Sequence, residues 1–110
     1  MSNSSLGRAS EYKVARFFEA HGWELIVRAA ASKGPADLIL AHEVHGLALV
    51  QVGRTSKRLD PADRERLCHA AELCHAIPLL AQHIPRQPIV IHHINRGPAS
   101  TWGRFHLEGQ

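Results

Sequence analysis

Residues 32–53 read SKGPADLILAHEVHGLALVQVG and give the clearest structural signal in this chain. Two apolar runs, 36–41 and 47–52, are separated by a short polar segment. Short apolar runs bounded by turn residues are typical of buried strands, and a loop of about four residues between them predicts a hairpin. Asp37 stands at the start of the first run and Gln51 at the end of the second. The hairpin should therefore bring these two side chains close together.

The sequence on either side of this hairpin predicts the other elements of one α/β domain. Asp60 and Pro61 are a strong helix start, because Asp is a favoured N-cap residue and Pro favours the first helical position. The expected order is α-β-β-β-α-β-β, a mixed sheet with a helix on each side. The predicted elements are a helix over 6–20, strands over 23–31, 36–41 and 47–52, a helix over 60–75, and strands over 77–82 and 88–94.

The domain is expected to span residues 1–110, with a flexible segment over 1–5 and an irregular C-terminal tail over 95–110. Trp102 and Phe105 predict that this tail docks on another surface, either of this domain or of a partner subunit.

The composition is that of a globular protein with a mild positive charge. The chain has 110 residues, 45% of them hydrophobic and 21% charged, and a formal net charge of +3. This charge favours a polyanionic partner but does not require one. No run approaches the ~18 apolar residues of a membrane span, and the N-terminus lacks the apolar core of a signal peptide. A soluble, cytoplasmic protein is expected.

The cysteines and several histidines have ordinary explanations. Cys68 and Cys74 lie six residues apart in the second predicted helix, so they point in different directions and cannot bridge each other. They are expected to be reduced, partly buried thiols, and their spacing does not suit zinc. His42 and His45 flank the predicted hairpin turn and are expected to be solvated.

Several oxygen-bearing groups come together in the predicted fold as candidate metal ligands. Asp37 and Gln51 lie on neighbouring strands, the carbonyl of Val52 is next to them, and Glu11 would approach from the first helix. Mg²⁺ prefers hard oxygen ligands and keeps several waters, so a few such groups suffice. A metal ion held in this way can activate water and stabilise charge during phosphodiester hydrolysis.

The pattern Ser-x-Gly-x-x-Asp at 32–37, followed by Gln51-Val52, resembles the active-site pattern of the PD-(D/E)xK nucleases. Further matching residues make the chain similar to the archaeal-type Holliday junction resolvases, which also occur in phages. These residues are Gly7, Arg8, Glu11, Gly22, Trp23, Arg28 and Ser32. The resemblance covers about residues 6–80. It implies a restriction-endonuclease-like fold and a homodimer that nicks four-way DNA junctions with Mg²⁺, for which Mn²⁺ is expected to substitute.

The resemblance also implies roles for individual residues. Glu11, Asp37 and Gln51 match the metal-binding positions of the family, and Ser32 and Arg28 match positions near the scissile phosphate. The implied catalytic residues are therefore Glu11, Asp37, Gln51 and Ser32. The expected DNA-binding residues are Arg8, Arg28, Lys33, Arg54, Lys57 and Arg58.

The chain departs from the family at Gly53. In the family a Lys at this position orients the attacking water or stabilises the developing charge, and Gly can do neither. Three explanations are open: Arg54 or Lys57 reaches into the site, the protein cuts slowly with metal alone, or it binds junctions without cutting them. A non-catalytic branched-DNA-binding relative and a nuclease for other DNA substrates are therefore alternative functions.

Overall fold

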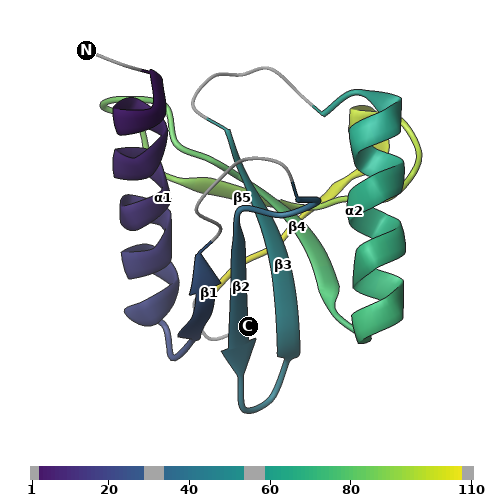
Figure 1. The fold of residues 1–110 in the computed structure, drawn as a ribbon, viewed down its shortest axis with the longest axis horizontal. Helices are drawn as coiled ribbons and strands as arrows, with labels where there is room; N and C mark the ends of the chain where they lie inside the picture. The colour runs from purple at the N-terminus through teal and green to yellow at the C-terminus, as the bar shows by residue number, and fades with distance from the viewer. Residues whose placement is uncertain (1–2, 29–33, 54–58, 108–110) are drawn as a thin grey trace.

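The structure is a computed structural model that describes residues 3–28, 34–53 and 59–107 (Figure 1). Its helices and strands follow the predicted order α-β-β-β-α-β-β and add a short sixth strand. They are α1 (Asn3–Glu19), β1 (Glu24–Arg28), β2 (Leu38–His42), β3 (Gly46–Gly53), α2 (Pro61–Cys74), β4 (Ile77–Gln82), β5 (Val90–His93), the 3₁₀ turn η1 (Ala99–Thr101) and β6 (Gly103–Arg104).

The six strands form one mixed sheet in the order β1-β2-β3-β4-β5-β6. Strands β3 and β4 are parallel and all other neighbours are antiparallel. A parallel pair needs a crossover connection, and α2 is the helix in that crossover. As a result, β3 and β4 end at the same edge of the sheet at which β2 begins.

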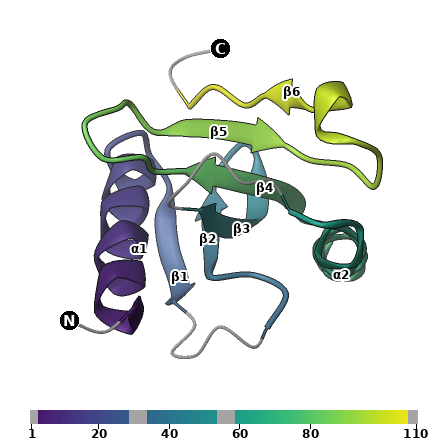
Figure 2. The same cartoon turned by 90° about the horizontal axis from the view of Figure 1, so that it is seen from above.

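The two helices cover opposite faces of the sheet, and each face has its own core (Figures 1 and 2). On the α1 face, Val14 and Phe18 pack with alternate residues of the strands, among them Leu38 and Val50. On the α2 face, the buried residues are Leu49, Leu67, Cys68, Ala71, Leu80 and Ile94. This alternation is the two-residue period of a strand, and it assigns each strand side chain to one helix.

Helix α2 begins where the sequence predicts, because its capping signals are local. The side chain of Asp60 accepts a hydrogen bond from the backbone N–H of Asp63 at 2.9 Å, and Pro61 is the first helical residue. The prediction of two partly buried thiols was wrong for Cys74, which is exposed, while Cys68 is buried. The helix buries Leu67, Cys68 and Ala71 against the sheet, whereas Cys74 is its last residue and is exposed.

Three segments differ from the prediction. Helix α1 begins at Asn3, three residues before the predicted helix start at residue 6. The β2–β3 loop has three residues, since His42 pairs with Gly46 and Gly46 adopts a φ of +78°. Strand β1 covers Glu24–Arg28 of the predicted 23–31, and residues 29–31 lie outside the described part of the chain.

His42 and His45 were predicted to be solvated, which is confirmed for the exposed His45 and not for the half-buried His42, and both rings contact Trp23. His45 is stacked on Trp23 with ring centroids 5.7 Å apart, and His42 lies 5.0 Å from the same ring. The tight loop folds back over the start of β1, which makes these contacts possible. His45 remains exposed and His42 is half-buried, so the two rings form the edge of an aromatic cluster.

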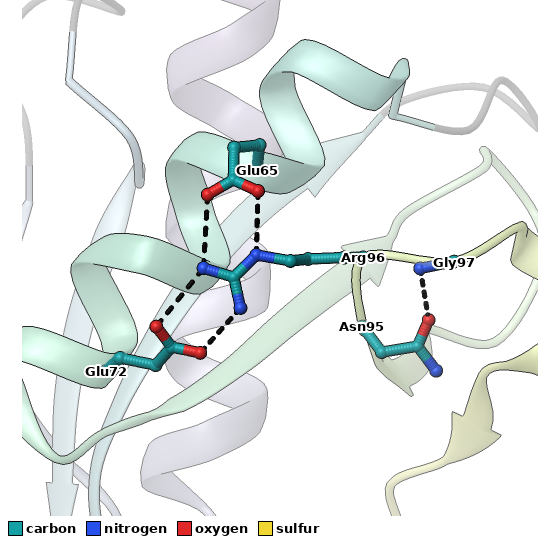
Figure 3. A network of polar contacts seen from close by, with 5 residues as sticks. All are labelled: Glu65, Glu72, Asn95, Arg96 and Gly97. Atoms are coloured by element: carbon teal, nitrogen blue, oxygen red, sulfur yellow. Dashed lines mark hydrogen bonds and ion pairs between the residues drawn. The ribbon is translucent and has the colours of Figure 1, made fainter.

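The C-terminal tail docks on this domain, which is one of the two alternatives that Trp102 and Phe105 predicted. Trp102 packs on the α2 face and Phe105 on the α1 face. Between β5 and η1, Arg96 binds the carboxylates of Glu65 and Glu72 on α2, and Asn95 accepts the N–H of Gly97 (Figure 3). We call Arg96, Glu65 and Glu72 the Arg96 clamp.

Among the described helices, neither is long and apolar enough to cross a membrane.

Candidate active site

Asp37 is anchored at the edge of the sheet where β2 begins and β3 ends. Its backbone N–H donates to the carbonyl of Val50 at 2.9 Å, and its carboxylate accepts the N–H of Val52 at 2.8 Å. Only 6% of the residue is exposed. Burial raises the pKa of this carboxyl, and the hydrogen bond from Val52 opposes that rise. The site therefore holds a carboxylate that the protein desolvates and only partly compensates.

Gln51 stands across the hairpin from Asp37. Leu38 and Val50 are the last paired residues of β2 and β3 at this edge, and Asp37 and Gln51 are their next neighbours along the two strands. Gln51 also lines a small pocket of about 130 Å³, together with Gly34, Pro35, Asp63 and Arg66. The hairpin and the start of α2 thus enclose the Gln51 amide on the α2 side of the sheet.

Val52 and Gly53 connect this edge to the next strand. Val52 pairs with Ala81 and Gly53 pairs with Gln82 in the parallel register. The carbonyl of Gly53 accepts the N–H of His83 at 2.7 Å. The backbone at the position where the resolvase pattern has lysine is therefore fixed in the sheet, although Gly53 offers no side chain for chemistry.

Glu11 and Arg28 form a pair between α1 and β1. The guanidinium of Arg28 lies 3.4 Å from the Glu11 carboxylate and 4.9 Å from the centre of the Tyr12 ring. Both side chains are largely shielded, with 13% of Glu11 and 26% of Arg28 exposed. The two residues that the sequence predicts for metal and phosphate thus lie beside each other, because α1 crosses the end of β1.

The donors at this edge suit a hard cation. Asp37 supplies a carboxylate oxygen, Gln51 an amide oxygen and Val52 a backbone carbonyl, which are ligand types that Mg²⁺ prefers. Glu11 offers a second carboxylate from α1, where it pairs with Arg28. Within the described residues, no three His, Cys, Asp or Glu side chains gather as a metal site. A metal ion here would therefore need Gln51, backbone or water oxygens beside the carboxylates.

No protein-family model matches the chain, and no curated protein does so either. Among solved structures, the chain is similar to Archaeoglobus fulgidus Hjc, a Holliday junction resolvase from an archaeal hyperthermophile. The likeness shows the fold. The two chains share 18% sequence identity at a TM-score of 0.64, over 76% of this chain and 74% of the resolvase. The restriction-endonuclease-like arrangement expected from the sequence thus has a match in a resolvase structure.

Sequence reasoning missed a second, partly buried polar pair at the same edge. Ser10 is buried, and its hydroxyl lies 3.2 Å from Nδ1 of His83, which follows β4 directly. Burial, with a smaller effect of Lys13, lowers the pKa of His83, which favours the neutral ring. Ser10 and His83 are 73 residues apart in sequence, and only their places next to Glu11 and β4 could have drawn attention to them.

The structure places some of the predicted site residues and leaves others untested. Asp37 contacts Val52, Gln51 lies across the hairpin from Asp37, and Glu11 contacts Arg28. Arg8 lies in α1, and its side chain is outside what the structure describes. Ser32, Lys33, Arg54, Lys57 and Arg58 lie outside the described residues.

Proposed function

We propose that this protein is a metal-dependent endonuclease that acts on four-way DNA junctions. The observation that carries the proposal is the anchoring of Asp37 against Val52, opposite Gln51, at one edge of a resolvase-like fold. The carboxylate there is buried yet receives only one hydrogen bond from the described residues. A divalent cation would provide the missing stabilisation of its negative charge.

In this proposal Asp37, Gln51 and Glu11 hold Mg²⁺ or Mn²⁺, with the Val52 carbonyl as a further ligand. The bound ion would activate a water molecule and stabilise charge on the phosphate. Val52 fixes the Asp37 carboxylate through its N–H, so the ligand keeps one orientation. Arg28 keeps free donors beside its pair with Glu11, because a guanidinium carries five N–H groups, and it would bind a phosphate oxygen.

The arms of the junction would be bound by basic residues that flank this edge in sequence. Arg54, Lys57 and Arg58 follow Gly53 directly, Lys33 precedes Asp37, and Arg8 precedes Glu11 by one helical turn. Such contacts to phosphates place the DNA without reading its sequence. The net charge of +3 favours a polyanionic partner such as DNA.

A homodimer completes the proposal, because a two-fold dimer places two sites on the two strands of a nearly two-fold junction. Sedimentation velocity should then give a mass near twice 12.2 kDa. A mass near 12.2 kDa with and without junction DNA would rule the dimer out.

The test of the function is cleavage of a labelled four-way junction with Mg²⁺ and with Mn²⁺, beside a linear duplex of the same sequence. Paired, symmetric nicks in the junction alone are expected. Cutting of both substrates would support the alternative of a nuclease for other DNA.

A second function is favoured by Gly53, which removes the side chain that the family uses for water or charge. On this alternative the protein binds branched DNA without cutting it. Tight junction binding with no nicks under either metal would select this function over the first.

A further inference from the structure

The loss of a lysine side chain at Gly53 leaves a gap on one particular face of the sheet. Leu49 belongs to the core under α2, and strand alternation puts Gln51 and Gly53 on the same face. A lysine at position 53 would thus project on the α2 side, next to Gln51. Any residue that takes over its charge has to reach Gln51 from that side.

Helix α2 supplies such a residue in Arg66. Arg66 lines the 130 Å³ pocket together with Gln51, and it carries the only positive charge among the described lining residues. It precedes Leu67, which is fully buried and fixes this turn of the helix against the sheet. Arg64, the other arginine of α2, donates instead to the carbonyl of Leu59 at 3.5 Å. Arg66 is therefore the α2 cation that the pocket places next to the candidate site.

The chemistry of arginine defines what Arg66 can do there. Its guanidinium stays protonated, so it cannot accept a proton from water, but its planar fork can bind two phosphate oxygens. Arg66 already makes a contact in the structure, and five donors allow it to keep that contact while binding a phosphate. Asp63 lines the same pocket and reduces its positive charge.

We propose that Arg66 binds the phosphate that is cleaved, and so supplies from α2 the positive charge that a lysine at position 53 would bring. The proposal rests on the nuclease function argued above and adds to it a specific phosphate-binding residue. It also accounts for the tolerance of glycine at position 53, since the charge comes from the facing helix.

The test compares Arg66→Gln with Arg16→Gln, which removes the same charge from an exposed position of the other helix. Single-turnover cleavage of the four-way junction with Mn²⁺ should fall by about 10²-fold in R66Q, as expected when one charge-stabilising donor is lost. R16Q should cut like the wild type. R66K should lie between, because it keeps the charge without the fork, and thermal melts should show that all variants are folded.

Restoring a lysine with G53K tests whether Arg66 acts through its charge. If Arg66 had only a structural role, this lysine would not restore cleavage. The double variant G53K/R66Q should recover most of the cleavage that R66Q loses. Binding without metal adds a second readout: the salt slope of junction affinity should fall by about 0.9 in R66Q, the value for one phosphate contact, and stay unchanged in R16Q.

The outcomes separate this inference from the proposed function. Wild-type cleavage with an unaffected R66Q would overturn the role of Arg66 and leave the nuclease intact. If the wild type binds junctions without cutting them, the salt slope of junction affinity becomes the test. An unchanged slope in R66Q would then overturn the role of Arg66. A wild type that neither binds nor cuts junctions would remove the proposed function and the role of Arg66 with it.

Discussion

The Arg96 clamp and the Asp37 edge both hold carboxylates, but the protein treats their charges in opposite ways. In the clamp, Arg96 meets both exposed carboxylates, those of Glu65 and Glu72, and lowers the pKa of each (Figure 3). At the sheet edge, burial raises the pKa of Asp37, and one backbone N–H only partly offsets the rise.

The difference between the two regions concerns the source of the positive charge. The clamp is complete within the chain and ties the tail to α2. The Asp37 edge has a desolvated carboxylate with oxygen ligands beside it, and it would be completed by a cation from solution.

Replacing Asp37 with asparagine should produce the largest effect. The amide oxygen can still accept the N–H of Val52, but it provides no charge for a metal ion. Metal-dependent junction cleavage should drop by about 10³-fold, equivalent to several kcal/mol of lost charge stabilisation. Thermal melting without metal should stay at the wild-type temperature or rise, since a buried charge is removed. Full cleavage by D37N would contradict the site.

Adding metal should stabilise the Asp37 edge and leave the clamp unaffected. At a concentration of Mn²⁺ 100 times Kd, binding to the folded state stabilises it by about 2.7 kcal/mol, or roughly 10 °C in Tm for a domain of this size. The same addition should not shift D37N, whereas R96A should gain as much as the wild type. An equal shift in wild type and D37N would place the bound metal elsewhere.

Breaking the clamp with Arg96→Ala should lower the melting temperature by a few degrees and spare cleavage. The pairs are exposed, so each contributes little, but together they hold the tail on α2. E65Q leaves Arg96 one carboxylate and should cost less than R96A. Loss of junction cleavage in R96A, with the fold intact by circular dichroism, would show that the tail acts on the site.

Lowering the pH should reduce the stability that the clamp provides and remove the stability penalty of ionised Asp37. These opposite changes are expected to be the smallest effect. Arg96 lowers the pKa of Glu65 and Glu72 below 4.5 in the folded state. The stability gap between wild type and R96A should therefore be full above pH 4.5 and close as the pH falls below it.

Asp37 behaves in the reverse way, because its pKa is raised above 3.8 in the folded state. Its ionised form destabilises the fold at neutral pH, and this penalty should vanish as the pH falls toward 3.8. Any advantage of D37N over the wild type should therefore be present at pH 7 and lost at low pH. Urea titrations of the three proteins between pH 7 and pH 3 measure both trends.

Local signals predicted much of the fold and part of the site. The hairpin was predictable because two short apolar runs enclose a turn, and the same register places Asp37 opposite Gln51. The start of α2 was predictable from Asp60 and Pro61, which cap the helix within a few residues. Such signals depend on neighbours in sequence, so they can be recognised without knowledge of the tertiary structure.

Contacts between distant segments could not be predicted in the same way. Arg96 binds residues 31 and 24 positions away, and Ser10 meets His83 across 73 positions. Strand β6 has two residues, too few for a periodic pattern, and it forms because the docked tail meets β5. These features follow from packing, which one sequence pattern does not encode.

The most direct test is to locate a bound Mn²⁺ by anomalous scattering from crystals grown with the metal. A peak is expected within coordination distance of the Asp37 carboxylate and the Gln51 amide oxygen, and no peak is expected there in D37N crystals. A wild-type peak away from Asp37, or none at saturating Mn²⁺, would contradict the claim that this edge of the sheet takes its positive charge from solution.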